Sequence, residues 1–194
     1  MQPPRRLETL DDLLAQAGHY AHFCMGRSGT MAPTLFLIGA DGPLMFVPPS
    51  LENESEKDAF ATVARLMCIA YGATASVMAL EAWLKTAKPN EPLDLSEPPS
   101  EAFDREEVIV LMGESPSVQK QKFLTIIRSD NKKFFGLGEY DLIAVDSVEG
   151  RFAKILPPKK PSVGDRALAQ AILKAKGINV AKPGTIVRLT RFRR

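Results

Sequence analysis

One stretch, residues 59–110, most constrains the fold, because a helical pattern in it is followed by two runs of strand length. Apolar residues recur in steps of three and four over residues 60–71, the spacing of one helical face, and Gly72 then suits a left-handed helix end. Residues 75–84 are short and largely apolar, which indicates a buried strand, although their Ala, Met, Leu and Glu also suit a second helix. We prefer the strand, packed on the preceding helix, and expect a second strand over residues 106–112.

The two ends of this helix–strand unit carry local signals. Ser55 can cap the free amide groups of the first helical turn, and Glu56 and Asp58 are favourable at the positive end of the helix dipole. The only tryptophan, Trp83, lies near the end of the predicted strand. Because tryptophan contributes a large apolar area, we expect a core anchor or a rim residue rather than a platform for a ligand.

The same patterns predict elements on both sides of this stretch. Thr9 can cap a helix, and Asp41-Gly42 is typical of a hairpin turn. The further elements that we expect are a helix over residues 7–20, strands over 34–39, 44–47, 122–128, 133–137 and 142–145, a helix over 163–176 with Leu168, Ala171, Ile172 and Ala175 on one side, and a strand or tail over 185–192. This order favours an α+β fold: an antiparallel sheet with two helices on one face, plus a basic C-terminal helix and strand as an appendage.

Charge is divided unevenly along the chain. Residues 150–194 hold twelve Lys or Arg and one acid, Asp165, for a formal charge of +11, so the other residues carry −9 of the total of +2. The proline-rich residues 157–161 mark a linker at this change. We therefore predict an acidic α+β body over residues 1–156 and a basic C-terminal unit over residues 157–194.

Composition excludes several classes of protein. A chain of 194 residues with 45% hydrophobic and 25% charged residues is typical of a globular protein with one substantial core. No apolar run reaches the ~18 residues of a membrane span, and the N-terminus has no apolar signal core. Two cysteines make neither a disulfide framework nor a metal site. We expect a cytoplasmic protein without cofactor or metal.

Three short motifs lie within residues 34–113. They are Glu81-Ala82-Trp83, then Pro98-Pro99-Ser100-Glu101 after a proline-rich segment, then Asp104-Arg105-Glu106-Glu107 at the entry to a strand. This pattern resembles uncharacterised small proteins of phages, plasmids and other prokaryotic mobile elements. The resemblance implies a mobile-element setting and brings no assigned activity.

Three clusters are candidates for chemistry, and each also has a structural interpretation. Cys24 with His19 or His22 would supply an activated thiolate in a hydrolase or transferase, although we prefer an ordinary role for these residues at the end of a helix. The glycine-rich residues 26–30 would hold a phosphate on backbone amides, but they lack the lysine and the strand–loop–helix context of a P-loop. The acidic residues Asp104, Glu106 and Glu107 do not converge by themselves, because consecutive strand residues point to opposite faces. We therefore favour a solvated strand entry, with Arg105 bridging to a neighbour.

The basic C-terminal unit is the strongest candidate for a binding surface. Its side chains can neutralise phosphates, and one aromatic ring between arginines offers a stacking surface. The residues are Lys159, Lys160, Arg166, Lys174, Lys176, Lys182, Arg188, Arg191, Phe192, Arg193 and Arg194.

We therefore expect a non-enzymatic interaction protein of a mobile element. It would bind a host protein or nucleoprotein complex at or near a nucleic-acid site, for example as an inhibitor of a host defence complex. The alternatives are the Cys24/His enzyme and a dimeric structural protein with a swapped basic arm. The basic unit would otherwise act as a solubilising tail or dock on the acidic body. The sequence does not define the oligomeric state.

Overall fold

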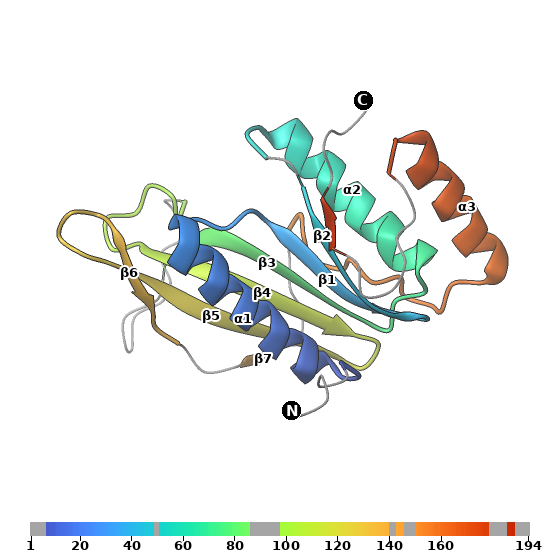
Figure 1. The fold of residues 1–194 in the computed structure, drawn as a ribbon, viewed down its shortest axis with the longest axis horizontal. Coiled ribbons are helices and arrows are strands. Elements are labelled where there is room, and N and C mark those ends of the chain that lie inside the picture. Colours follow the sequence, from blue (N-terminus) through green and yellow to red (C-terminus); the bar gives the residue numbers. More distant parts are fainter. Residues whose placement is uncertain are drawn as a thin grey trace.

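In the computed structural model, one curled sheet is flanked by helices (Figure 1). The structure describes residues 7–48, 51–85, 98–139 and 150–178 in full, and the backbone of residues 143–145 and 186–188. The helices are α1 (Leu10–Ser28), α2 (Glu54–Ala70) and α3 (Val163–Ala175). The strands are β1 (Thr34–Gly39), β2 (Gly42–Val47), β3 (Ala75–Leu84), β4 (Glu106–Ser115), β5 (Val118–Arg128), β6 (Phe134–Leu137), β7 (Ile143–Val145) and β8 (Ile186–Arg188).

The sheet is antiparallel over most of its width. Its strands lie in the order β6-β5-β4-β3-β1-β2, and β8 adds a short parallel strand beside β2. β6 pairs with the C-terminal end of β5, and β7 pairs with the N-terminal end of the same strand. The predicted α+β class with an antiparallel sheet is therefore confirmed, as is the preference for a strand over residues 75–84.

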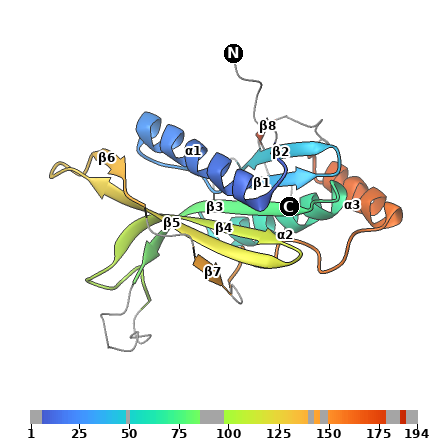
Figure 2. The same ribbon diagram turned by 90° about the horizontal axis from the view of Figure 1, so that it is seen from below.

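Helices α1 and α2 cover opposite faces of this sheet, so the prediction of two helices on one face is wrong. Phe36 and Ile38 of β1 pack in the core beneath α1, whereas Leu35 and Leu37 pack in the core beneath α2. Successive strand residues point to opposite faces, so the two cores lie on either side of β1. Figure 2 shows α1 and α2 on the two sides of the sheet. All six residues of β1 are buried, as expected for a strand covered on both faces.

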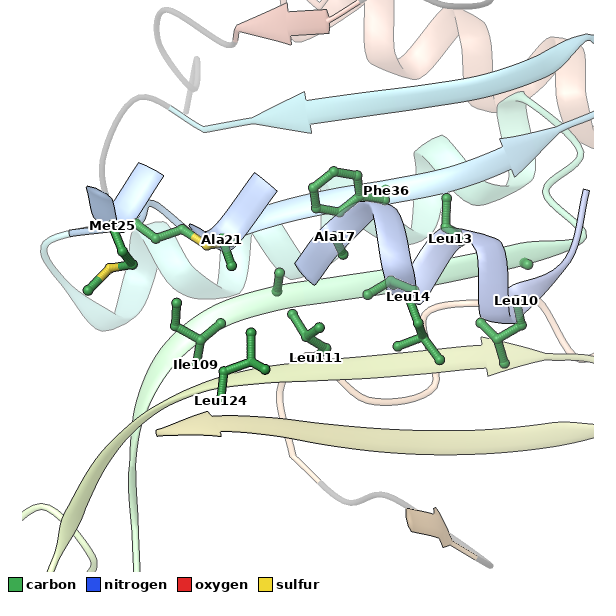
Figure 3. Close-up of a cluster of buried hydrophobic side chains, with 14 of the residues drawn as sticks. Leu10, Leu13, Leu14, Ala17, Ala21, Met25, Phe36, Ile109, Leu111 and Leu124 are labelled. Atoms are coloured by element: carbon green, nitrogen blue, oxygen red, sulfur yellow. The ribbon is translucent and has the colours of Figure 1, made fainter. Parts of the chain in front are cut away.

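Helix α1 is longer than the sequence indicates. It begins with a capping box between Thr9 and Asp12, as the predicted cap at Thr9 requires, and ends at Gly29 with φ 71°. The apolar face continues through Ala21 and Met25, so the helix does not stop near residue 20. Figure 3 shows this face above the side chains of Ile109 and Leu111 in β4 and Leu124 in β5.

Helix α2 begins two residues earlier than its predicted cap implies. The side chain of Asn53, rather than that of Ser55, accepts a hydrogen bond from the Glu56 N–H. Ser55 lies inside the first turn, where its hydroxyl is not needed as the cap. The core beneath α2 is built around Phe60 and Met67, which are fully buried.

Helix α3 shares that core. It begins with a capping box between Ser162 and Asp165, and Ala169 and Leu173 pack in the same cluster as the buried face of α2. Gln170 Nε2 also donates a hydrogen bond of 3.1 Å to the carbonyl of Ala70 at the end of α2. The helix of the predicted appendage is thus part of the packed body. Within the described ranges, no helix combines the length and hydrophobicity that a membrane crossing requires.

A segment that we call the strap, residues 150–156, joins the sheet to α3. Glu114 of β4 is buried, and its carboxylate accepts hydrogen bonds from the N–H groups of Lys154, Ile155 and Leu156. Lys154 has φ 54°, which turns consecutive N–H groups toward one anion. From the other side, Arg65 Nη2 of α2 donates to the carbonyls of Arg151 and Ala153, at 2.9 and 3.2 Å.

Replacing Glu114 tests how far the strap stabilises the fold. We expect Glu114→Ala to lower the free energy of unfolding by about 3 kcal/mol, because three backbone donors lose their acceptor. Glu114→Gln keeps one acceptor oxygen and should cost roughly half as much. Urea unfolding followed by circular dichroism measures both. The exposed Glu101 provides the control, since Glu101→Ala should change the free energy by less than about 0.5 kcal/mol. Equal effects at the two positions would contradict a stabilising role for the Glu114 carboxylate.

Candidate partner-binding surface

The apolar side of α3 that the sequence predicts faces solvent. Leu168 is 64% exposed and Ile172 is 36% exposed, and Ala171 and Ala175 beside them are exposed as well. The residues that pack α3 against α2 lie on a different side of the helix, and there are fewer of them than on the exposed apolar side. They are Ala169 and Leu173, followed by Ile178 just beyond the helix end.

A groove runs beside this exposed side, between α2, α3 and residues 157–161. Its volume is about 240 Å³, and we call it the α3 groove. Most of its wall is apolar, with Lys159 and Lys160 adding positive charge. The lining residues are Leu66, Ile69, Pro157, Lys159, Lys160, Pro161, Asp165, Leu168, Ala169 and Ile172.

The predicted binding residues of the C-terminal unit fall into four groups. Lys159, Lys160 and Lys174 are exposed. Arg166 and Lys176 are partly buried, and the Arg166 side chain lies against Gly72 at the end of α2. Arg188 is described by its backbone in β8. The remaining predicted residues, Lys182, Arg191, Phe192, Arg193 and Arg194, lie outside the described residues. The structure thus brings two of the predicted lysines, Lys159 and Lys160, to the α3 groove.

The candidate Cys–His pair does not come together. Successive residues of a helix are turned by about 100°, so in α1 Cys24 lies about 140° around the axis from His19 and about 160° from His22. Both imidazoles are exposed, whereas Cys24 packs against the core beneath α1. In the part of the chain that the structure describes, no hydrogen bond joins the thiol to either imidazole. This geometry does not support an activated thiolate at Cys24.

The second thiol is no better placed for catalysis. Cys68 is fully buried beneath α2, and burial raises the pKa of its thiol, with the negative charge of Glu114 raising that pKa further. A thiolate is the reactive form of cysteine, so a buried neutral thiol is chemically inert.

The glycine-rich candidate for a phosphate site, residues 26–30, is helical over its first three residues. Residues 26–28 form the last turn of α1, and the Gly29 N–H donates to the carbonyl of Met25 at 2.8 Å. Ser28 Oγ donates to the carbonyls of Cys24 and Thr30, both at 2.9 Å. Amides committed to a helix in this way do not form a cradle for a phosphate.

Within the described part of the chain, the carboxylates at the start of β4 do not form a metal-binding cluster. Glu107 forms a two-pronged ion pair with Arg128 of β5, and Asp104 is exposed. Arg105 does bridge to a neighbour, because its guanidinium lies 4.6 Å from the ring centre of Trp83. Trp83 is 43% exposed and is therefore a rim residue. Among the described residues, no group of three or more His, Cys, Asp or Glu side chains is placed to hold a metal ion.

Sequence reasoning missed a second cleft, of about 620 Å³, beside the loop that joins α1 to β1. Glu81 of β3 lines it, together with Met31, Lys57, Arg151 and Phe152. The Glu81 carboxylate accepts a hydrogen bond from the Met31 N–H. Burial raises the pKa of Glu81, the Met31 hydrogen bond opposes this, and the charge of Glu107 adds to the increase. The only signal in the sequence is that Glu81 is the single charged residue of its strand.

The raised pKa of Glu81 predicts a pH dependence of stability. The folded state holds this proton more tightly than the unfolded state, so the Glu81 contribution to stability falls as pH rises from the ordinary carboxyl pKa through the raised one. Relative to Glu81→Gln, the native chain should therefore lose free energy of unfolding as the pH rises above about 4, the ordinary range of a carboxyl pKa. Urea unfolding at several pH values measures this difference. Glu101→Gln serves as the exposed control, and a flat difference for Glu81→Gln would contradict the assignment.

Comparison of the chain with protein-family models, with curated proteins and with solved structures found no match. The resemblance to small proteins of mobile elements therefore stays a prediction. Function has to be argued from the surface itself, and the exposed side of α3 combines apolar side chains, a groove and lysines in one place.

Proposed function

We propose that this chain is a non-enzymatic interaction protein that binds a host protein or nucleoprotein complex through its basic C-terminal unit. The observation that supports this most is the exposure of Leu168 and Ile172 beside a groove with lysines at its rim. Contiguous exposed apolar surface with a polar rim is typical of an interaction site.

A solubilising role for this unit explains the lysines but not the apolar residues. A helix that only covers α2 needs the side carrying Ala169 and Leu173, and polar residues would serve on its outer side. Leaving Leu168 exposed instead gives up roughly 1.5–3 kcal/mol that its burial would contribute. A partner that covers the outer side recovers this stabilisation on binding.

The lysines determine which charge on a partner this surface would favour. Lys159, Lys160 and Lys174 present positive charge near the exposed apolar residues. Such charge favours an acidic protein surface or a site close to nucleic acid. With the mobile-element setting that the resemblance implies, the concrete form of this proposal is an inhibitor of a host defence complex.

A pair of matched double variants tests the proposal. The full chain is used to capture partners from a prokaryotic lysate with and without nuclease, and the affinity for the captured complex is then measured. We expect Lys159→Gln with Lys160→Gln to weaken binding roughly tenfold, with a smaller salt dependence, because positive charge at the rim is lost. The control is Lys132→Gln with Lys133→Gln, since these adjacent lysines are also exposed and lie in the turn before β6.

Equal binding by the two double variants would count against the basic unit as the binding surface. Substitution is preferable to ending the chain at Leu156, because removing α3 would also remove Leu173 and Ile178 from the core beneath α2. The mass of the chain at low and high salt separates the swapped-dimer alternative, which predicts a dimer that salt dissociates.

A further inference from the structure

The exposed side of α3 has the dimensions of a helix-packing surface. We define the α3 stripe as Gly164, Leu168, Ala171, Ile172 and Ala175, which share one side of the helix and are, apart from Ile172 at its edge, well exposed. The stripe extends over three turns, about 16 Å. Two large side chains alternate with three small residues. The small residues let a second helix approach closely, while Leu168 and Ile172 project between its side chains.

The size of the α3 groove points to a side chain rather than a small molecule as its occupant. At about 240 Å³ it lies below the ~300–1,000 Å³ range of small-molecule sites. Leu66 and Ile69 of α2, with Pro157 and Pro161 opposite, form apolar walls. One or two apolar anchors of a docked helix would fill this space next to Leu168.

Charge on both sides of the stripe selects the character of the partner. Lys159 and Lys160 lie on the groove side, and Lys174 lies on the other side of the helix. The single acid, Asp165, is engaged by the N–H and hydroxyl of Ser162 in the helix cap. A partner with acidic residues flanking its apolar side therefore meets lysines on both sides.

The same charges argue against two other occupants. A second copy of α3 would place lysines opposite lysines, which is unfavourable. Nucleic acid would use the lysines, but phosphate contacts do not require Leu168 and Ile172 to be buried. We infer that the α3 stripe and groove bind an acidic amphipathic helix of a partner protein. This inference rests on the proposed function and specifies the partner.

Two synthetic peptides provide a direct test with the full chain. Both carry the same apolar face of leucines at helical spacing, and one has glutamates and the other lysines on the flanks. Fluorescence anisotropy of the labelled peptides measures affinity. We expect the glutamate peptide to bind at least about tenfold more tightly than the lysine peptide. Duplex DNA added to the complex should not displace the glutamate peptide.

Substitutions in the stripe identify the contact. Leu168→Gln with Ile172→Gln should weaken binding of the glutamate peptide by roughly tenfold or more, because the apolar contact area is lost. Val163→Gln is the matched control, since Val163 is 74% exposed on the same helix but lies off the stripe. Because these side chains contribute little to the core, the urea midpoint of each variant should stay close to that of the native chain.

The outcomes separate this inference from the function on which it rests. Equal binding of the two peptides, or unchanged binding after Leu168→Gln with Ile172→Gln, would overturn the inference. If the stripe variant still captures the partner complex but the Lys159 and Lys160 variant does not, the basic unit binds without the stripe, and only the inference is wrong. If neither variant affects capture, the proposed function is wrong as well.

Discussion

The contact between the Glu114 carboxylate and three consecutive N–H groups of the strap determines where the C-terminal part of this molecule lies. A buried carboxylate without donors costs several kcal/mol (~2–7 even for a neutral polar group), so β4 tolerates Glu114 only because the strap supplies its donors. The strap in turn requires the Glu114 carboxylate as an acceptor, since its three N–H groups would otherwise lie partly or fully buried without this hydrogen bond. Arg65 does the same for two strap carbonyls from the side of α2. Both polar requirements are met only when the strap crosses the end of β4, and α3 then follows at a fixed place beside α2.

Once the strap is fixed, the rotation of α3 about its axis decides what the surface presents. Ala169 is small enough to allow close approach to α2, Leu173 fills the core, and Gln170 is bonded to the end of α2. Together they fix the helix with Leu168 and Ile172 outward. A helix under selection for stability alone would bury its larger apolar side. The orientation seen here leaves Leu168 and Ile172 at the surface instead, and this exposure is the observation on which the proposed binding role rests.

Local signals predicted most elements, and the errors arose where tertiary packing overrides them. The strand over residues 75–84 was predictable because its length and composition agree, and β3 has these bounds. The opposite placement of α1 and α2 was not inferred, although the continuous burial of Thr34–Gly39 in β1 reflects a six-residue run that is apolar except at its ends. The cap at Asn53 replaced Ser55 because the helix begins earlier than its apolar pattern does.

The sequence indicated where in the chain the candidate site lies, but not that it would include an exposed apolar surface. Charge counting placed it in the C-terminal unit, and helical spacing correctly grouped Leu168 with Ile172. Spacing shows which residues share a side of a helix, but not whether that side meets the core, and α3 has a second, smaller apolar side that does. The residues that settle this, Glu114 and Arg65, bind main-chain groups 41 and 86 residues away, which no side-chain pattern encodes. The stripe is therefore recognisable as an exposed apolar surface only after the polar contacts of the strap have shown which side of α3 is left without a partner among the described residues.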